Sequence, residues 1–491
     1  MKSCQLIIYD QINTKYLMDE VDHYIYFYSK KLWVWPYWVI NTNKISQILE
    51  YAISKSYIND ISQIYTHKKV HWSICEDYYI WIYEYCKAND ICDIYIMIPS
   101  ENYLYIYFQK ISDKLKLDNI NVIFTPNTQF LISHEEFAKQ YDKPPVMENF
   151  YRWMRKKFDV LMDGDKPVGG KRNYDSENRK FDKNYKNKSQ IIPNDNIYIK
   201  QAEEYIGQTI NDIYYPVSRQ EALNVLSDFV MNKLDRFGEL EDAMYIDDQY
   251  IYHSMISTSI NFGMLTPLEV IKAVENANTD INNKEWFIRQ ILWWREYMYH
   301  RFYYYKDNIY NQNILTHDTK LPQWFWRPEE SPLAMNCINT VLKSVKNTWY
   351  SHHITRLMII WNFCLLMWYN PHDVNKRFWE MYTDAFERVV TPNVLGMSQF
   401  ADGWNLATKP YISSANYINN MSNYCSSCFY DPKIKSWPKA CPMNYLYWNF
   451  VDKNKELFKR QPYMISNLSK VDIDDIRRQS EEFILSLSNN K

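Results

Sequence analysis

Residues 160 to 179 read Val160-Leu-Met-Asp-Gly-Asp-Lys-Pro-Val-Gly-Gly-Lys-Arg-Asn-Tyr-Asp-Ser-Glu-Asn-Arg179 and divide the chain into two parts of different pattern. They hold three of the 8 glycines in a sequence of 491 residues. In a chain so poor in glycine, we expect each one where the backbone needs a positive φ or where a ligand comes close to it. The patterns on either side of this turn decide the fold class.

The part before this turn alternates strand-like and helix-like patterns. Within residues 1 to about 132, short apolar runs are separated by stretches with the spacing of a helix. The expected strands are Leu6 to Tyr9, Tyr24 to Tyr28, Asp93 to Ile98 and Asn121 to Phe124, and the expected helices are Ile45 to Ile58 and Tyr78 to Lys87. This alternation predicts an α/β domain.

The part after residue 198 has almost no strand pattern. The expected helices are Arg219 to Asn232, Pro267 to Asn276, Lys284 to Tyr305, His353 to Trp368 and Val374 to Val389. We therefore expect an α/β domain over residues 1–132, an interdomain linker over 133–198 and an all-helical domain over 199–491.

Residues 171–188, within the expected linker, are strongly basic. Seven basic residues (Lys171, Arg172, Arg179, Lys180, Lys183, Lys186, Lys188) stand against three acidic ones (Asp175, Glu177, Asp182), a net charge of +4. The whole chain has a net charge of -2, so any attraction to a polyanion must come from such a local patch. This basic loop is either a solvated linker or an arm that holds DNA phosphates.

Four of the nine cysteines form a set. Cys425 and Cys428 make a Cys-x2-Cys pair, Cys441 precedes a proline, and Cys337 stands alone far upstream. Four thiolates suit either tetrahedral zinc or an iron-sulfur cluster, and the single distant member is unlike the two close pairs of a zinc ribbon. Zinc, a 4Fe-4S cluster and ordinary buried thiols all remain open on spacing alone.

The other cysteines and the apolar runs indicate the compartment. The five remaining cysteines show no disulfide framework, which is typical of a reducing cytosol or nucleus. The sequence opens without a charged and apolar leader, and no apolar run of about twenty residues is present. We expect a soluble, monomeric protein with no membrane partner, in the cytoplasm, or in a nuclear or viral setting if the source is not bacterial.

A series of ordered motifs identifies a family. They are Asn149-Phe-Tyr-Arg152, Val160-Leu-Met-Asp163, Lys166-Pro-Val-Gly-Gly-Lys171, Glu241-Asp-Ala-Met244, His253-Ser254, Trp294-Arg-Glu296, His352-His-Ile-Thr-Arg-Leu-Met358, Pro392-Asn-Val-Leu-Gly-Met397 and Phe400-Ala-Asp-Gly403, followed by the cysteine set. Between about 145 and 450 the chain resembles the prokaryotic iron-sulfur branch of the cryptochrome/photolyase family, whose members repair (6-4) photoproducts. The N-terminal domain is matched only at Asp10-Gln11.

The resemblance implies a fold and a set of cofactors. The fold is a Rossmann-like α/β domain with a parallel sheet, followed by a large all-α domain that binds FAD. Family members carry a 4Fe-4S cluster on four cysteines at this spacing, so the resemblance favours iron-sulfur over zinc for Cys337, Cys425, Cys428 and Cys441. A lumazine-type antenna, 6,7-dimethyl-8-ribityllumazine, is the further cofactor that the family carries in its N-terminal domain.

Several residues are expected in the flavin pocket. His253, Ser254, Ser257 and Asn261 are spaced as a polar stripe on one helix, which can bind a diphosphate and would otherwise be a solvated face. By resemblance, Arg289 and Arg295, Arg356 paired with Asp384 from the next helix, and Asp402 with Asn405 are the further flavin candidates.

The catalytic and DNA-binding candidates follow the same resemblance. His352 and His353 resemble the histidine pair that faces the lesion, with His353 as the general acid and His352 as its partner or a lesion contact. Lys409 and Tyr411 are candidates for contact with the lesion or flanking DNA. The DNA-binding lysines and arginine expected in the basic loop are Lys171, Arg172, Lys183, Lys186 and Lys188.

The chain also departs from the family pattern. Arg172 follows Lys171 where Trp is expected, and Pro328 to Pro332 replaces an aromatic-rich stretch. Arg377 and Arg388 stand where aromatic residues are expected, and Val390 where a carboxylate is expected. These changes affect the usual aromatic route of electron transfer to the flavin, although Trp349, Trp361, Trp368 and Trp379 remain nearby in sequence.

The favoured function is light-driven repair of (6-4) photoproducts in UV-damaged DNA by reduced FAD, with the lesion flipped out of the helix. One alternative is a cryptochrome-like blue-light photoreceptor that binds FAD without repair. A second is a cluster-bearing nucleic-acid-binding protein of primase type, against which the flavin-pocket motifs argue.

Overall fold

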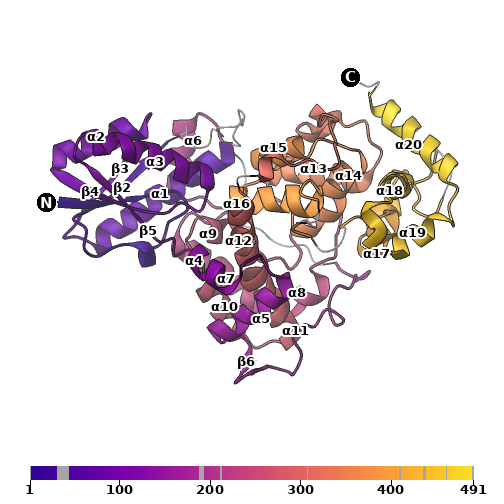
Figure 1. The fold of residues 1–491 in the computed structure, drawn as a ribbon, viewed down its shortest axis with the longest axis horizontal. Coiled ribbons are helices and arrows are strands. Elements are labelled where there is room, and N and C mark those ends of the chain that lie inside the picture. Colours follow the sequence, from indigo (N-terminus) through magenta and orange to yellow (C-terminus); the bar gives the residue numbers. More distant parts are fainter. Residues whose placement is uncertain are drawn as a thin grey trace.

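The computed structural model describes residues 2–29, 44–186, 193–210, 213–306, 308–403, 405–407, 411–434, 438–460 and 462–488. Figure 1 shows an α/β domain at the N-terminal end and a larger helical region, with the last helices at the far side from the sheet. The predicted fold class is confirmed by this arrangement.

The α/β domain is built on a parallel sheet of five strands. In spatial order they are β3 (Lys69–Ile74), β2 (His23–Tyr28), β1 (Lys2–Ile7), β4 (Ile91–Met97) and β5 (Asn121–Thr125). Central strand β2 is fully buried, whereas edge strand β3 is only partly covered. A sheet of this order, with β1 in the middle, is doubly wound, and its ligand crevice lies at the carboxyl end of β1 and β4.

Three helices connect these strands: α1 (Lys44–Ile64), α2 (Tyr78–Asn89) and α3 (Asn102–Lys116). Right-handed crossovers place α1 on one face of the sheet and α2 with α3 on the other. Helix α6 (Ile197–Ile206) returns to the α/β domain and packs on α1. The expected start of the helical domain at residue 199 is therefore wrong, because it falls inside a helix of the α/β domain.

The four predicted strands are present, with ends shifted by at most four residues. Strand β3 and helix α3 were not predicted. As a half-exposed edge strand, β3 includes Lys69 and His71 and so lacks a continuous apolar run. Helix α3 carries Tyr and Ile residues on its exposed side as well as on its buried side, so the sequence does not show the helical spacing of apolar residues clearly.

The expected linker is not a simple linker. Helices α4 (His134–Gln140) and α5 (Met147–Phe158) lie within it and pack against the helical domain. A short hairpin of β6 (Met162–Asp163) and β7 (Lys166–Pro167) follows. The glycines of the deciding turn behave as expected, since Gly169 and Gly170 have φ values of 71° and 72°.

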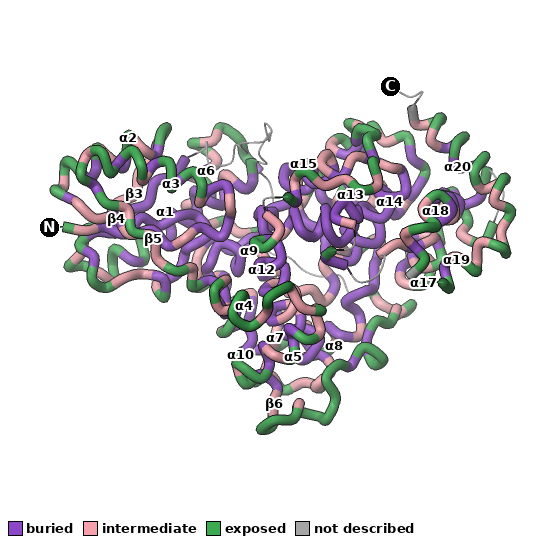
Figure 2. The backbone as a smooth tube through the Cα atoms, viewed as in Figure 1, coloured by how far each residue is buried: buried purple, intermediate pink, exposed green. Residues whose placement is uncertain are grey.

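The helical domain comprises α7 (Arg219–Asn232), α8 (Leu234–Leu240), α9 (Ser257–Asn261), α10 (Pro267–Glu275), α11 (Ile281–Arg289), α12 (Glu296–Tyr305), α13 (Asn336–Thr348), α14 (Asn362–Leu366), α15 (Pro371–Met381), α16 (Glu387–Thr391), α17 (Ala415–Met421), α18 (Pro442–Lys453), α19 (Pro462–Leu468) and α20 (Ile473–Ser488). Three π-helical turns interrupt them: η3 (Gln290–Arg295), η7 (Thr355–Trp361) and η8 (Pro392–Ser398). Figure 2 shows the buried backbone running through the centre of this domain.

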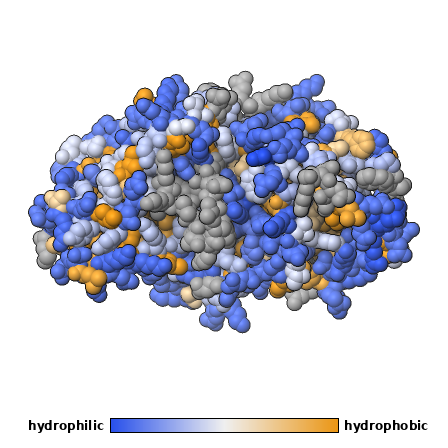
Figure 3. Space-filling model, turned by 90° about the horizontal axis from the view of Figure 1, so that it is seen from above, coloured by the Kyte–Doolittle hydropathy of each residue, from blue (hydrophilic) through white to orange (hydrophobic). Residues whose placement is uncertain are grey.

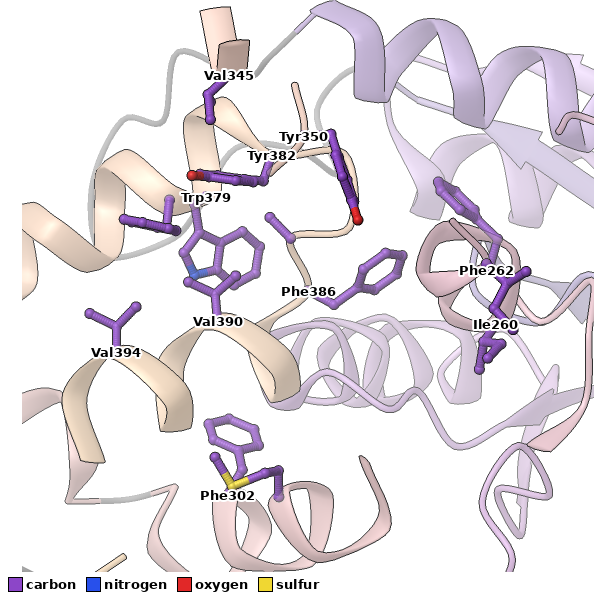
Figure 4. Packing of buried hydrophobic residues seen from close by; sticks show 14 of the residues in the cluster. Ile260, Phe262, Phe302, Val345, Tyr350, Trp379, Tyr382, Phe386, Val390 and Val394 are labelled. Atoms are coloured by element: carbon purple, nitrogen blue, oxygen red, sulfur yellow. The ribbon is translucent and has the colours of Figure 1, made fainter. Parts of the chain in front are cut away.

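Two helix predictions need correction. The helix expected from Val374 to Val389 is broken between Met381 and Glu387, where the chain turns between α15 and α16. Figure 4 shows Tyr382 and Phe386 packing into the apolar core on either side of this turn. The stripe from His253 to Asn261 does not lie on one helix, because α9 begins only at Ser257 and Met255 has a φ of 58°.

The two domains meet at the ligand crevice of the sheet. Arg388 of α16 donates to the Ser100 hydroxyl at 2.6 Å, lies 3.3 Å from a Glu101 carboxylate oxygen and donates to the Asn261 carbonyl at 3.1 Å. Gly263 also approaches closely, since a Cβ there would stand 2.8 Å from the Asp10 carbonyl oxygen. Side chains of the helical domain thus fill the crevice.

The face seen in Figure 3 is largely hydrophilic, with scattered hydrophobic residues. Among the described residues, no helix has both the length and the apolar character required to cross a bilayer.

Candidate active site

A cavity of about 250 Å³ lies inside the helical domain. Its walls come from residues just after α8, the segment 253–257, the segment 350–353, and all three π-helical turns. A π turn widens a helix locally and is common at functional sites. Gln290, Ile291 and Trp294 of η3, Arg356 and Trp361 of η7, and Asn393 of η8 all face this space.

An ion pair forms one wall. Arg356 donates two hydrogen bonds to Asp384, both of 3.0 Å, so the predicted pairing is confirmed. Ser257 donates to the same carboxylate at 3.0 Å, and Asn261 donates to the Asp384 main-chain oxygen at 3.2 Å. The prediction that Asp384 comes from a helix is wrong, because it lies in the turn between α15 and α16. That turn lets its carboxylate meet Arg356 end-on.

Three histidines line the cavity. His253 and His352 stack with ring centroids 4.4 Å apart, and His353 lies beside Trp294 and Trp361 at 6.0 and 6.2 Å. Burial lowers the pKa of His253 to about 3, with a smaller contribution from His353. Burial and then Arg356 lower the pKa of His353 to about 4, and the pKa of His352 is also well below its usual value. All three rings are therefore neutral at pH 7 in the free protein.

Polar atoms without protein partners indicate that the cavity suits a polar ligand. Nε2 of His253, Nδ1 of His352 and Nε1 of Trp361 are buried and have no hydrogen-bond partner. Buried polar atoms are normally satisfied, so such a group implies partners supplied by a ligand or by water. Donors, acceptors, an arginine and aromatic walls together fit a flavin, whose ring system carries both polar edges and apolar faces.

Several predicted flavin contacts lie outside this cavity. Arg289 binds Glu285 at 2.7 Å and Asp175 at 2.6 Å, and so holds the loop after β7 against α11. Arg295 pairs with Glu296 at 2.6 Å and lies 4.2 Å from the Phe130 ring.

Asp402, Asn405 and Asn261 also do not line the cavity. The Asp402 carboxylate accepts from Leu406 at 2.9 Å, and Asn405 donates to the Asp402 carbonyl at 2.6 Å, so these two residues build one turn. Asn261 lies behind the Arg356–Asp384 pair. Its amide positions Asp384 and its carbonyl accepts from Arg388.

The basic loop is bonded to the helical domain at its middle. Main-chain bonds run from Arg179 to Gly238 and from Lys180 to Glu239, at 3.2 and 2.7 Å. The Arg179 guanidinium lies 4.6 Å from the Trp286 ring, and the Trp286 indole donates to Glu241, which lines the cavity. The loop therefore passes beside the cavity.

The predicted DNA contacts are mostly exposed. Lys183 and Lys186 are exposed, as are Lys171 and Arg172, although Lys171 pairs with Glu177 at 3.0 Å. Tyr411 is half-buried. Burial raises the pKa of its phenol, and the charge of Arg179 lowers that pKa to a smaller extent. Lys188 and Lys409 lie outside the described residues.

The four cysteines of the set converge at one small cavity of about 10 Å³. Cys337 is in the first turn of α13, Cys425 and Cys428 are in and after a 3-10 turn (Tyr424–Ser427), and Cys441 precedes α18. Among the described residues, no three His, Cys, Asp or Glu side chains are placed to hold one metal ion. Zinc needs four sulfurs at about 2.3 Å from one ion, whereas each thiolate of a cubane binds its own iron. The four thiols are thus brought to one small space from three separate segments of the chain.

Some cavity residues were not predicted individually. Glu241, Trp294 and Asn393 lay within the motifs that carried the family resemblance, so the motifs held the signal without giving the role. Tyr350 stands two residues before His352, and its place beside the catalytic candidates could have drawn attention to it. Trp361 follows Arg356 in η7, and only the folded helix shows that both side chains face the same cavity.

Comparison with known proteins gives the family. The family described as deoxyribodipyrimidine photo-lyase-related protein matches residues 62–214. A (6-4) photolyase of Agrobacterium fabrum is 39% identical over 389 residues, 75% of this chain and 76% of that protein. An uncharacterized protein of Acanthamoeba polyphaga mimivirus is 38% identical over 102 residues, 21% of this chain and 76% of its own length.

Solved structures agree on the fold. A class III photolyase of Agrobacterium tumefaciens superposes with a TM-score of 0.58 at 12% identity, covering 96% of this chain and 98% of that one. A cryptochrome of Synechocystis gives 0.57 at 11% identity, covering 97% and 90%. The fold and the charged cavity define a member of the photolyase and cryptochrome class. Within that class, the chain belongs to the photolyase-related family that includes the (6-4) photolyase of Agrobacterium fabrum.

Proposed function

We propose that this protein is a DNA photolyase that repairs (6-4) photoproducts in UV-damaged DNA, with FAD held in the helical domain. The observation that carries the proposal is that the His352–His353 pair and the Arg356–Asp384 pair line the same cavity. The histidine pair suits proton transfer to a damaged base, and the Arg356–Asp384 pair suits contact with the polar edge of a cofactor. A relative that is named a (6-4) photolyase supports the choice of lesion.

The cofactor-binding residues are assigned from the cavity. Arg356 with Asp384, His253, Ser254, Ser257 and Trp361 would hold FAD there, with Asn261 supporting Asp384 from behind. Bound FAD supplies the one-electron, light-driven donation to the lesion. Arg356 and Asp384 neutralise each other, so this wall presents no isolated charge that would draw water into the cavity.

His353 is proposed as the proton donor, with His352 as its neighbour in the chain. Burial and Arg356 keep the pKa of His353 near 4 in the free protein, so the ring must gain its proton when substrate binds. DNA brings negative phosphates to the mouth of the cavity, and nearby negative charge raises a histidine pKa. Proton transfer would thereby be coupled to lesion binding.

Lys183 and Lys186, with Lys171, Arg172, Lys188, Lys409 and Tyr411, are proposed as DNA contacts. The exposed lysines would bind phosphates and orient the duplex without reading its sequence. The attachment of Arg179 beside Trp286 and Glu241 supports this proposal for the exposed lysines of the basic loop.

For the four cysteines we propose a structural 4Fe-4S cluster. It would tie the start of α13 to the segment before α18 and close a long loop in the chain. Anaerobic purification should give about four irons per chain and broad visible absorption. Stoichiometric zinc without iron would overturn this assignment.

A lumazine-type antenna in the N-terminal domain stays a prediction. Arg388 fills the crevice of the sheet and is bonded to Ser100 and Glu101. No step of the proposed reaction depends on an antenna.

The test is illumination of the reduced protein with oligonucleotides that contain a (6-4) photoproduct or, separately, a cyclobutane dimer. We expect repair of the (6-4) lesion. In His353→Asn, flavin content and lesion binding should stay near wild type while repair per bound flavin drops by about 100-fold, the scale of losing a general acid. Full repair per flavin in this variant would remove His353 from the mechanism, and no (6-4) repair by the wild type would favour the photoreceptor alternative.

A further inference from the structure

Two runs of aromatic rings lead away from the cavity. The first goes from Trp361 to Phe378 at 4.8 Å between ring centroids, and then to Tyr382 at 4.7 Å. The second goes from Tyr350 to Tyr250 at 5.6 Å, with the rings nearly parallel, and then to Tyr214 at 6.4 Å. Trp361 and Tyr350 both line the cavity.

The first run ends at a buried cation. The Arg377 guanidinium carbon lies 5.9 Å from the Phe325 ring, 5.6 Å from Phe378 and 6.0 Å from Tyr382. Arg377 is fully buried, and among the described residues it has no ion-pair partner. Arg377 donates two hydrogen bonds to the Phe325 carbonyl oxygen, at 3.2 and 3.0 Å. Removing an electron from a ring beside this buried cation adds a second positive charge at low dielectric. Phe378, in addition, has no heteroatom and is hard to oxidise.

The second run reaches the surface. Tyr350 is buried, while Tyr250 and Tyr214 are half-buried. The guanidinium nearest to Tyr350 is that of Arg356, at 6.0 Å, and Asp384 neutralises it. Burial raises the pKa of the Tyr250 phenol to about 12, a hydrogen bond with Thr348 partly opposes this, and Tyr214 is partly exposed to solvent. Every ring in this run is a phenol and can be oxidised with loss of its proton.

We propose that Tyr350, Tyr250 and Tyr214 form a relay that carries electrons from the surface to the flavin of the cavity. The proposal rests on the proposed flavin site and names a route specific to this chain. With FAD bound, Tyr350 would give up the first electron, Tyr250 would refill Tyr350, and Tyr214 would refill Tyr250. Tyr214 then holds the oxidised phenol, has given its proton to solvent, and is restored by one electron and one proton from an external thiol.

The experiment compares conservative variants of the two runs. Tyr250→Phe and Tyr214→Phe remove one phenol each from the second run, and Tyr382→Phe is the matched control in the first. None of these residues lines the cavity. Flavin content is measured first, and then the rate of light-driven flavin reduction in the presence of a thiol. Both test variants should slow this rate by about tenfold, a barrier higher by about 1.4 kcal/mol, while the control should match wild type.

A second readout follows the radical itself. Illumination with a spin trap, followed by peptide mapping, should place the adduct on Tyr214 in the wild type and lose it in Tyr250→Phe. Normal photoreduction in both test variants, or slow photoreduction in Tyr382→Phe alone, would overturn the relay.

Chemically reduced protein separates the relay from the proposed function. Reduced Tyr250→Phe should repair the (6-4) lesion as well as reduced wild type, because the relay is not needed once the flavin is reduced. If reduced wild type repairs nothing but photoreduces through these tyrosines, the repair proposal fails and the relay stands.

Discussion

Two buried arginines use ion pairs in different ways. Arg356, at the cavity, meets one carboxylate with two parallel bonds of 3.0 Å. Arg388, at the domain junction, divides its bonds among Ser100, Glu101 and the Asn261 carbonyl, and lies 3.8 Å from Asp10. The first is a closed pair that leaves its wall neutral. The second is one cation shared by several acidic and polar groups from both domains.

The surroundings of the two arginines differ accordingly. Burial raises the pKa of Glu101 to about 8 and that of Glu387 to about 7, and Arg388 partly opposes this for Glu101. The junction is therefore rich in carboxyl groups and depends on its one arginine. At the cavity the charges are balanced, and the neighbouring histidines are neutral with unpaired nitrogens. A balanced pair can border a ligand site, whereas a shared cation holds two domains together.

The largest expected effect is at the junction. Arg388→Met should lower the free energy of unfolding by about 3–5 kcal/mol, because Asp10 and Glu101 lose their buried partner. Urea unfolding followed by circular dichroism measures this loss. Arg327→Met, which removes an exposed arginine, is the matched control and should change stability little. If Arg388→Met is as stable as the control, the junction does not depend on Arg388.

The pH dependence of stability should have opposite slopes in the two regions. In the folded chain His353 has a pKa of about 4, below the value of about 6.5 for an unfolded chain. Its contribution to the free energy of unfolding is therefore complete above pH 6.5 and is lost as the pH falls toward 4. That shift corresponds to about 3 kcal/mol. Glu101 has a folded pKa of about 8, so its contribution is lost as the pH rises from about 4.5 toward 8.

Single variants separate these two slopes. In unfolding experiments over pH 4 to 8, His353→Asn should flatten the acidic side and Glu101→Gln the alkaline side. Unchanged profiles in both variants would show that neither group shifts as proposed.

Arg356→Met should cost less stability than Arg388→Met, about 1–3 kcal/mol, because Asp384 keeps its bond from Ser257 and faces the cavity. It should, however, lower the FAD content of the purified protein, which absorbance measures after denaturation. A double variant with Asp384→Asn gives the coupling energy of the pair. Equal FAD content in Arg356→Met and wild type would separate this pair from cofactor binding.

The smallest effect on stability is expected for the basic loop, where the charges are exposed. Lys183→Ala with Lys186→Ala should leave unfolding unchanged but weaken binding to damaged and undamaged duplexes alike. The slope of log affinity against log salt should fall by about one for each lost phosphate contact. Salt titrations that coincide with wild type would show that the loop does not touch DNA.

The sequence predicted the α/β domain and most helices because apolar periodicity is a local property. It missed β3, whose lysine and histidine fit a half-exposed edge, and it joined α15 to α16 because the residues of the turn are as apolar as the helices on either side. The Arg356–Asp384 pair was predicted through the family resemblance alone. The position of Arg289 could not be predicted, because its partners Glu285 and Asp175 come together only in the folded chain.

The three π-helical turns around the cavity have a consequence for how this site tolerates length changes. A π turn contains one more residue than the α-helical turn it replaces, so each of η3, η7 and η8 is equivalent to a one-residue insertion into a helix. Deleting one residue from such a turn would restore a regular helix and leave the residues beyond it on the same face, because a π turn absorbs its extra residue locally. Arg356, Trp361 and Asn393 lie within these turns, so such a deletion would move their side chains relative to the cavity while the helices on either side remained intact. The site is thus more sensitive to a missing residue than to most substitutions.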